Sequence, residues 1–187
     1  MPIRRLSQDA LKHCLEIISR FDELAKYKRD YGEKFRTRCR TLPQLMEDVG
    51  IVATLAFAYA KASDKVRVPV EIAKKLGKEV REYRQGCVEC SICDIIAGYL
   101  DGKITIEEVK SVLQGKFDEA VGYAAFLYAT VQWLAQHCPV PRMGTLTVEN
   151  LLEKISELST TELALVMYFL RPMYNVLKEL TDAKYGG

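Results

Sequence analysis

Residues 34–61 read KFRTRCRTLPQLMEDVGIVATLAFAYAK, and this stretch decides the fold class. Its first seven residues hold four cations, namely Lys34, Arg36, Arg38 and Arg40. Apolar residues recur at helical spacing both before and after Gly50. Glycine commonly follows the last residue of a helix, so the stretch predicts two helices that meet at Gly50. The first is basic and contains Pro43, where we expect a new turn or a kink, and the second ends at Lys61.

Helical periodicity extends along the rest of the chain. Thr105 with Glu108 has the spacing of a capping box that opens a helix. Ser159 with Glu162 has the same spacing. No run of alternating β-branched residues and no internal repeat is found. The sequence therefore predicts an all-α single domain over residues 1–187, a bundle of about eight or nine helices. The expected helices span residues 7–25, 31–49, 51–62, 69–85, 87–100, 105–114, 117–137, 147–158 and 161–182.

The composition is that of a folded globular domain. The chain has 187 residues, of which 49% are hydrophobic and 28% are charged, so it can bury a core of its own. The formal net charge of +2 does not by itself require a nucleic-acid partner. Residues 26–40, however, hold seven Lys or Arg side chains against Asp30 and Glu33. Such a cluster favours a phosphate-binding face, with a solvated helix face as the alternative.

Aromatic residues accompany this cluster at helical spacing. Tyr27, Tyr31 and Phe35 lie four residues apart, among the cations of residues 26–40. Aromatic rings in such a stripe can stack on bases. The same spacing is typical of the packing edge of a helix, which is the more common role of an aromatic stripe.

The order of these motifs resembles a known family, the small all-helical subunit (subunit five) of the type III-B CRISPR-Cas effector, or Cmr complex. In that family a basic helix passes through a Leu-Pro or Phe-Pro step to a Gly, and a Leu-Ala-Phe helix ending in Lys follows. The corresponding residues here are Leu42-Pro43, Gly50, Leu55-Ala56-Phe57 and Lys61. Residues 161–180 also resemble the closing helix of the family.

The resemblance implies a non-catalytic structural subunit that helps hold guide RNA and target RNA in antiviral defence. Its expected partners are these two RNAs, the other Cmr subunits and copies of itself, and no cofactor is implied. The closing helix departs from the family at Pro172, which we expect to kink it. Residues 63–116 are longer than the family core needs, so we treat them as a family-specific elaboration. The residues carried over as RNA-binding are Arg36, Arg38, Arg40, Lys61 and Arg171.

A second hypothesis depends on the run of Cys87, Cys90 and Cys93. Thiolates at this spacing can converge on one metal ion or iron–sulfur cluster, so the alternative function is a metal- or Fe–S-binding helical protein. The fourth ligand of the ferredoxin pattern is missing nearby, because Cys138-Pro139 lies two expected helices further on. On a helix the three thiols would share one face and pack into the core, or two of them would form a disulfide. We therefore expect no bound metal.

Catalytic motifs are not recognised in the sequence. His13 and His137 each fall on an expected helix without a neighbouring nucleophile motif. No phosphate-binding loop, dinucleotide fingerprint or nucleophile elbow is present. Asp101-Gly102 begins a segment like the second half of an EF-hand loop, but Ala97 would then occupy a position that must supply an oxygen ligand. We expect no enzymatic activity from this chain.

The last expectations concern location and source. The segment after Arg4-Arg5 is mixed and polar, unlike the apolar core of a secretory signal. The longest apolar run, residues 50–60, is about half as long as a bilayer-spanning helix. We therefore expect a cytoplasmic protein without a membrane partner. Only two asparagines, Asn150 and Asn175, occur beside many Glu and Lys residues, which favours a thermophilic source.

Overall fold

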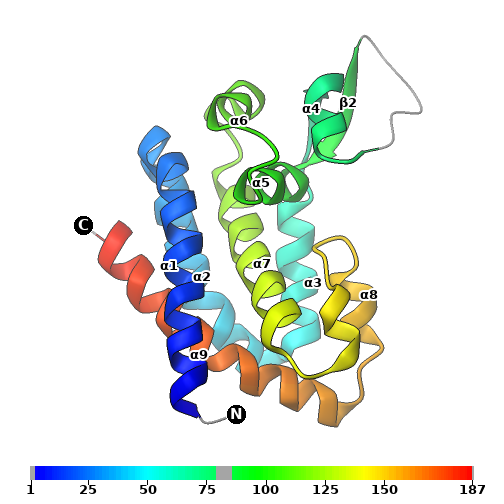
Figure 1. The fold of residues 1–187 in the computed structure, drawn as a ribbon. Coiled ribbons are helices and arrows are strands. Elements are labelled where there is room, and N and C mark those ends of the chain that lie inside the picture. Colours follow the sequence, from blue (N-terminus) through cyan, green and yellow to red (C-terminus); the bar gives the residue numbers. More distant parts are fainter. Residues whose placement is uncertain (1–2, 79–85, 187) are drawn as a thin grey trace.

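A computed structural model describes residues 3–78 and 86–186 of the chain. Helix α7 (Asp118–His137) lies along the centre of the molecule (Figure 1). Every residue from 120 to 131 is buried, which is typical of a helix enclosed on all sides. Gly122 lets α2 (Arg29–Val49) approach closely, because a Cβ atom at this position would lie 2.8 Å from the carbonyl carbon of Lys34.

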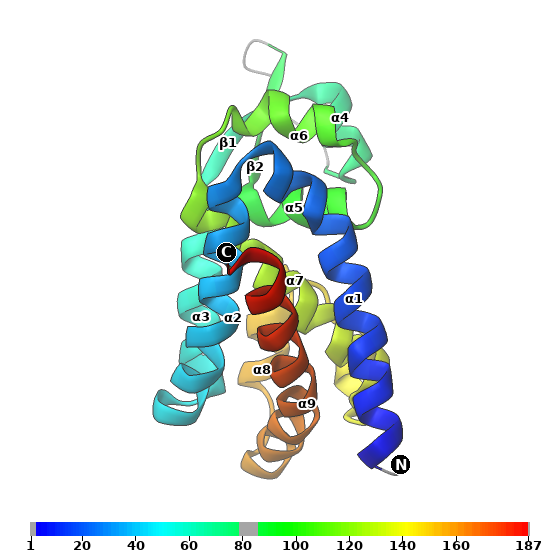
Figure 2. The ribbon, with the colours of Figure 1, turned by 90° about the vertical axis from the view of Figure 1, so that its left-hand side faces the viewer.

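Helices α1 (Ile3–Tyr27), α3 (Ile51–Ala62) and α9 (Thr160–Tyr185) complete the main bundle with α2 and α7. Helix α2 packs against α7 and α9, α3 packs against α7, and α1 packs against α9 and α7. Figure 2 shows α9 lying between α1 and α2. Neither Pro43 nor Pro172 ends its helix. Burial of the helix faces on both sides of each proline outweighs the missing backbone hydrogen bond.

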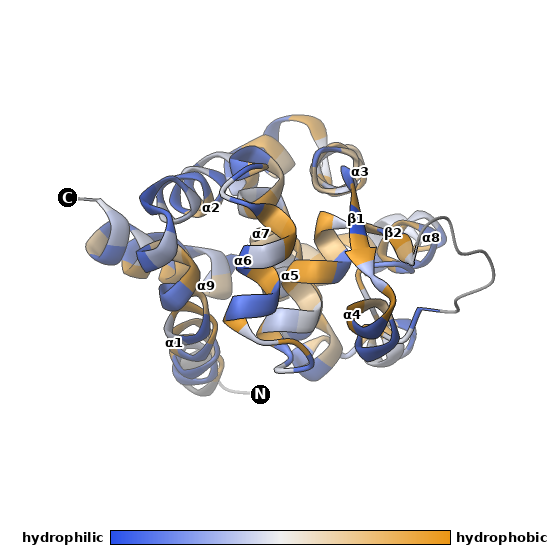
Figure 3. Cartoon of the chain, turned by 90° about the horizontal axis from the view of Figure 1, so that it is seen from above, coloured by the Kyte–Doolittle hydropathy of each residue, from blue (hydrophilic) through white to orange (hydrophobic). Residues whose placement is uncertain are grey.

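The upper end of the molecule holds a two-stranded antiparallel ribbon, β1 (Lys65–Pro69) and β2 (Cys87–Ser91) (Figure 1). In its register Val66 stands opposite Cys90. Figure 3 views the molecule from above and shows the ribbon beside the end of α3. The prediction of a helix from residue 87 and of a chain without strands is therefore wrong here. The strands are only five residues long, so their alternation is too short to separate from a charged loop.

The helices next to the ribbon also differ from their predicted bounds. Helix α4 (Val70–Lys75) is shorter than the expected helix over residues 69–85, of which residues 79–85 lie outside the described part of the chain. Helix α5 (Ile92–Leu100) begins where β2 ends. Ser91 caps it by accepting a hydrogen bond from the backbone N–H of Asp94. This capping box explains why the helix starts there and not at Cys87.

Two capping boxes were predicted correctly. Thr105 and Glu108 open α6 (Ile106–Leu113), and each side chain accepts a hydrogen bond from the other residue's backbone N–H. Ser159 and Glu162 open α9 in the same way. These reciprocal bonds satisfy backbone donors that have no partner within the helix.

The connection from α7 to α9 contains the 3-10 helix η1 (Pro141–Thr145) and helix α8 (Leu151–Ser156). Helix α8 is shorter than the predicted helix over residues 147–158. The described residues contain nine α-helices and one two-stranded sheet. The prediction of an all-α single-domain bundle is confirmed. Within the described ranges, no helix combines the length and the apolar character needed to cross a membrane.

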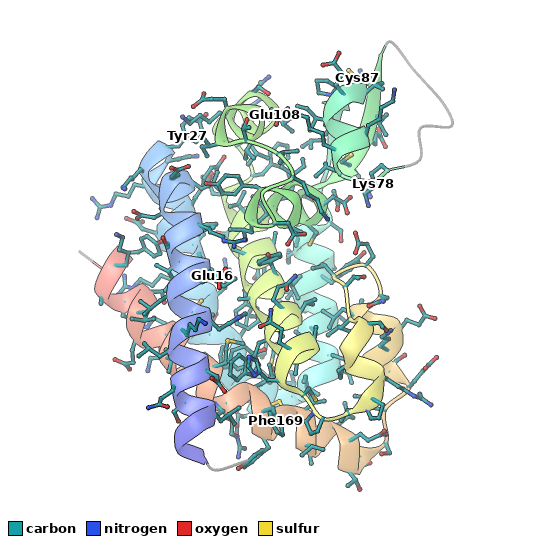
Figure 4. All side chains as sticks on the ribbon, viewed as in Figure 1. Glu16, Tyr27, Lys78, Cys87, Glu108 and Phe169 are labelled. Carbon is teal, nitrogen blue, oxygen red and sulfur yellow. The ribbon has the colours of Figure 1, made fainter. Side chains whose placement is uncertain are left out.

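The rings of His13, Trp133 and His137 pack together in a tilted stack, and Trp133 links them to Phe169 of α9, which Figure 4 labels near the lower end of the bundle. The centre of the Trp133 ring lies 4.0 Å from that of His137, one turn along α7, and 5.4 Å from that of His13 on α1. Trp133 Nε1 donates a 2.7 Å hydrogen bond to the Phe169 carbonyl oxygen of α9. His13 Nε2 lies 3.1 Å from the Ala129 carbonyl oxygen. Helices α1, α7 and α9 therefore meet at Trp133.

Candidate nucleic-acid interface

Helix α2 carries most of the cations expected to bind RNA, and its buried stripe determines where they point. The stripe comprises Tyr31, Phe35, Cys39, Leu42 and Met46. Arg36 and Arg40 are one turn apart and project on one side of it, towards α9. Arg38 projects on the other side, towards α7. The three arginines therefore belong to two different surfaces.

Arg36 and Arg40 both meet Asp182 of α9. Arg36 Nε donates a 2.7 Å hydrogen bond to Asp182 Oδ1, and Arg40 Nε lies 3.8 Å from the same oxygen. The hydrogen bond from Arg36, with the charges of Arg40 and Lys178, lowers the pKa of Asp182 below its ordinary value. Lys178 is exposed. This side of α2 therefore gathers three cations around one carboxylate.

Arg38 is held against α7. Its guanidinium pairs with Glu119, and its Cζ atom lies 4.2 Å from the centre of the Tyr123 ring. Its side chain is 15% exposed, and its Nε atom is buried without a hydrogen-bond partner among the described residues. Lys34 Nζ lies 2.5 Å from Glu119 Oε1, so two cations share one carboxylate here as well. Arg38 packs α2 against α7 through both its charge and its stem.

An aromatic row leads from Arg38 to Lys61. The Tyr123 ring of α7 meets the Phe57 ring of α3 edge-on, with 5.7 Å between their centres. Lys61 Nζ lies 5.8 Å from the centre of the Phe57 ring. Phe57 is 43% exposed, which is high for so large an apolar side chain. We call Lys34, Arg38, Phe57, Lys61 and Tyr123 the α2–α3 face.

The aromatic stripe of Tyr27, Tyr31 and Phe35 mainly packs helices together and offers little surface for base stacking. Tyr31 and Phe35 are fully buried. The rings of Phe35 and Phe21 lie 4.8 Å apart between centres, and the Tyr31 hydroxyl donates a 2.7 Å hydrogen bond to the Lys116 carbonyl oxygen. Tyr27 alone is exposed. Base stacking by this stripe is therefore limited to Tyr27, and the exposed ring on the basic surface is Phe57.

Residues 6–166 match the family model described as CRISPR-associated protein (Cas_Cmr5). The chain belongs to the Cas_Cmr5 family. It is a subunit of the type III-B CRISPR-Cas (Cmr) complex of CRISPR defence, and family membership implies association with other Cmr subunits. No curated protein matches the chain. The Cas_Cmr5 match includes all of α2, α3 and α7, and hence the whole α2–α3 face.

Arg171 lies beyond the Cas_Cmr5 match and apart from the cations of α2. It is exposed on α9, about three turns before Asp182. Its Nη2 atom lies 3.0 Å from Glu47 Oε1, in the last turn of α2. Asp48 follows in the same turn and is also exposed. The structure therefore places Arg171 beside an acidic end of α2, while the basic cluster lies further up the helix.

The cysteine run of this Cas_Cmr5 chain lies at the ribbon, and the prediction that it forms one helical face is wrong. Cys87 and Cys90 are three apart on β2, so the strand turns them to opposite faces. Cys93 belongs to α5, and burial raises the pKa of its thiol to about 12. All six cysteines are free. Among the described residues, no three His, Cys, Asp or Glu side chains form a group that could hold a metal ion.

This arrangement gives no support to the metal-binding alternative. Metal ligation requires thiolates, and burial raises the pKa of both Cys90 and Cys93. Figure 4 shows Cys87 at the top of the ribbon, on the side away from the bundle. The three sulfur atoms therefore do not converge, and the two buried ones serve as small apolar side chains in the core.

Proposed function

We propose that this chain is a non-catalytic, RNA-binding structural subunit that helps hold guide RNA and target RNA in the Cmr complex. The observation that carries the proposal is that the cations of α2 outnumber the carboxylates with which they pair. On each side of the helix at least two cations share one carboxylate, Asp182 on one side and Glu119 on the other. Both sides keep a net positive charge despite their ion pairs, so both attract phosphates.

The chemistry of RNA suits these surfaces. Proteins hold A-form RNA mainly through its phosphates and its shape, and Lys and Arg bind phosphates without reading bases. Phe57, exposed between Arg38 and Lys61 on the α2–α3 face, adds a ring on which an unpaired base could stack. Single strands and duplexes would therefore both be bound here.

The ion pairs of the acidic groups on these surfaces support a structural role. Asp182 and Glu119 are engaged in ion pairs with arginine and lysine, so neither is placed to activate water. The proposal includes association with copies of the same subunit, which the family resemblance implies, and a cytoplasmic location, which is the expectation from the sequence. Cleavage of RNA is then the task of other Cmr subunits.

The RNA-binding part is tested by replacing Arg36 and Arg40 together with Ala. The double variant should bind a fluorescent guide–target RNA duplex more weakly, both alone and in the assembled complex. The slope of log affinity against log salt should fall by about 0.9 for each phosphate that is no longer bound. Arg142→Ala is the matched control, because Arg142 is an exposed, ion-paired arginine on η1. Equal affinity and slope for double variant and wild type, with helicity intact, would contradict the proposal.

A further inference from the structure

The outer face of the β1–β2 ribbon carries cations outside the basic cluster of α2. Val66 and Val68 are buried, whereas Lys65 and Arg67 are exposed. Successive residues of a strand point to opposite faces, so Lys65 and Arg67 share the outer face. In Figure 3, which looks onto this end of the molecule, β1 and α4 carry strongly hydrophilic positions in blue.

Lys65 and Arg67 make no ion pair within residues 3–78 and 86–186, and neither does Lys61 at the end of α3. Asp64 precedes Lys65, and Glu89 stands opposite Arg67 in the register, yet neither carboxylate pairs with these cations. The arginines of α2, by contrast, are bound to internal carboxylates. A cation that makes no ion pair among the described residues can meet an external anion without first breaking such a pair.

The ribbon cations continue the α2–α3 face. Lys61 closes the aromatic row that begins at Arg38, and Lys65 follows it four residues later, at the start of β1. Figure 2 shows β1 above α3, on the same side of the molecule as α2. The basic surface therefore extends past the end of the helical bundle and onto the ribbon.

We infer, on the basis of the proposed RNA-binding function, that Lys61, Lys65 and Arg67 form a phosphate-binding track for RNA. Alternate residues of a strand are separated by about 7 Å, which is similar to the step between successive phosphates of one nucleic-acid strand. Lys65 and Arg67 can thus bind neighbouring phosphates of the same strand. Lys61 binds that strand where it passes from the ribbon to the α2–α3 face.

A repeating anion fits this surface better than an acidic protein does. Protein interfaces are anchored by buried aromatic or apolar side chains at their centre. The outer face of the ribbon presents Lys65, Arg67 and Glu89, with Pro69 and Cys87 at its edge, and none of these five is a large apolar side chain. Such a surface binds through charge, which a phosphate backbone supplies at regular spacing.

The track is tested with a double variant, Lys65→Thr with Arg67→Thr, because threonine suits an exposed strand position. The full chain and the assembled Cmr complex are each titrated against a fluorescent guide–target RNA duplex at several salt concentrations. With two fewer phosphates bound, affinity should weaken by about tenfold to thirtyfold at physiological salt and the salt slope should fall by about 1.8. Lys61→Ala should lower the slope by about 0.9.

The matched control removes two positive charges elsewhere, with Lys12→Ala and Arg142→Ala together. Lys12 is exposed on α1 and Arg142 is exposed on η1, and neither element is among those that pack closely against the ribbon in the described part of the chain. This control should keep both the affinity and the salt slope of the wild type. Circular dichroism establishes that each variant is folded. If the ribbon variant does not fold, the Lys61→Ala variant tests the track in its place, because alanine is well tolerated in a helix.

Three results would overturn the track. Unchanged affinity and slope in the ribbon variant and in Lys61→Ala, while Arg36→Ala with Arg40→Ala still weakens binding, would leave the proposed function intact and remove the track. If none of these variants weakens binding, the track and the proposed function both fail. A ribbon variant that binds RNA normally but no longer joins the Cmr complex would assign this surface to a neighbouring protein subunit.

Discussion

Arg38 differs from its neighbours on α2 in how much water reaches its guanidinium. Its side chain is 15% exposed, against 52% for Arg40, and it contacts both Glu119 and Tyr123. Its removal would leave a cavity beside the Tyr123 ring and would take away one of the two cations that share Glu119. We therefore expect Arg38→Ala to lower the free energy of unfolding by about 1–3 kcal/mol. Urea unfolding followed by circular dichroism measures this.

Arg40→Ala is the natural comparison for that measurement. Arg40 meets Asp182 at 3.8 Å in a partly exposed position, where an ion pair contributes little to stability. Its replacement should change the free energy of unfolding by less than about 0.5 kcal/mol. If the two variants were equally stable, the guanidinium of Arg38 would have no part in packing α2 against α7.

His13 and His137 make the stability of the fold depend on pH. Burial lowers the pKa of His13 below its ordinary value, and the nearby His137 lowers it further. Burial also lowers the pKa of His137. The unfolded chain therefore takes up protons at a higher pH than the folded chain. Stability is full above the ordinary histidine value of 6.5 and decreases as the pH falls through it, by at most about 1.4 kcal/mol per pH unit for each proton.

Thermal unfolding midpoints measured from about pH 7.5 down to pH 5.5 test this dependence, in a range where few other groups titrate. Two carboxylates oppose this lowering because they favour the protonated imidazole. Glu16 raises the pKa of His13, and Asp9 raises the pKa of His137. His13→Gln keeps an N–H group for the Ala129 carbonyl oxygen but cannot titrate, so its midpoint should fall less steeply with acid. Parallel curves for variant and wild type would refute the role of His13.

At the scale of single residues, the sequence predicted which cations cluster but not what they contact. Charge counts over residues 26–40 are local, so they identify a basic helix. The partners of its arginines come from α9 and α7, with Asp182 lying 146 residues from Arg36 and Glu119 lying 81 residues from Arg38. Only packing brings such distant residues together, and packing is what a single sequence does not reveal.

At the scale of elements, the approach of α7 to α2 depends on Gly122. Gly122→Ala would place a methyl group 2.8 Å from the carbonyl carbon of Lys34, so α2 would have to move. Alanine favours a helix over glycine by about 1 kcal/mol, yet we expect a net decrease of about 1–3 kcal/mol in the free energy of unfolding because the site is overpacked. Chemical unfolding of the purified variant measures it.

Gly144→Ala provides the control for this substitution. Apart from its two chain neighbours and the local backbone, no atom lies within 4 Å of a Cβ at Gly144, which belongs to η1. The change should therefore stay within about 0.5 kcal/mol. A Gly122→Ala protein as stable as the Gly144→Ala protein would mean that α2 and α7 can separate without cost.

Helix boundaries were predicted best where side chains determine them. The capping boxes at Thr105 and Ser159 and the stop at Gly50 all depend on residues within one turn of the boundary. The ribbon was missed because its strands pair across α4, with Val66 opposite Cys90. Three cysteines at intervals of three fit a helical face equally well, so their spacing alone does not show that Cys87 lies on a strand.

At the scale of the whole molecule, we expect no cleavage of RNA by the chain alone. Catalysis by metal ions needs converging ligands, and in the described part of the chain no such group is formed. Both histidines are packed against Trp133. Labelled RNA incubated with the purified protein and Mg²⁺ or Mn²⁺ should remain intact. Cleavage that disappears when one acidic residue is replaced would contradict a purely structural role.

The stack around Trp133 also gives the protein a built-in optical probe. Trp133 is the only tryptophan of the chain, and its ring is fully buried where α1, α7 and α9 meet. Its fluorescence therefore reports on that junction alone, with blue-shifted emission while the helices stay together. A protonated imidazole quenches indole fluorescence, so acid should dim the signal before the helices part and the emission moves to the red. Loosening of α1 or α9 during assembly or RNA binding could thus be followed without attaching a dye.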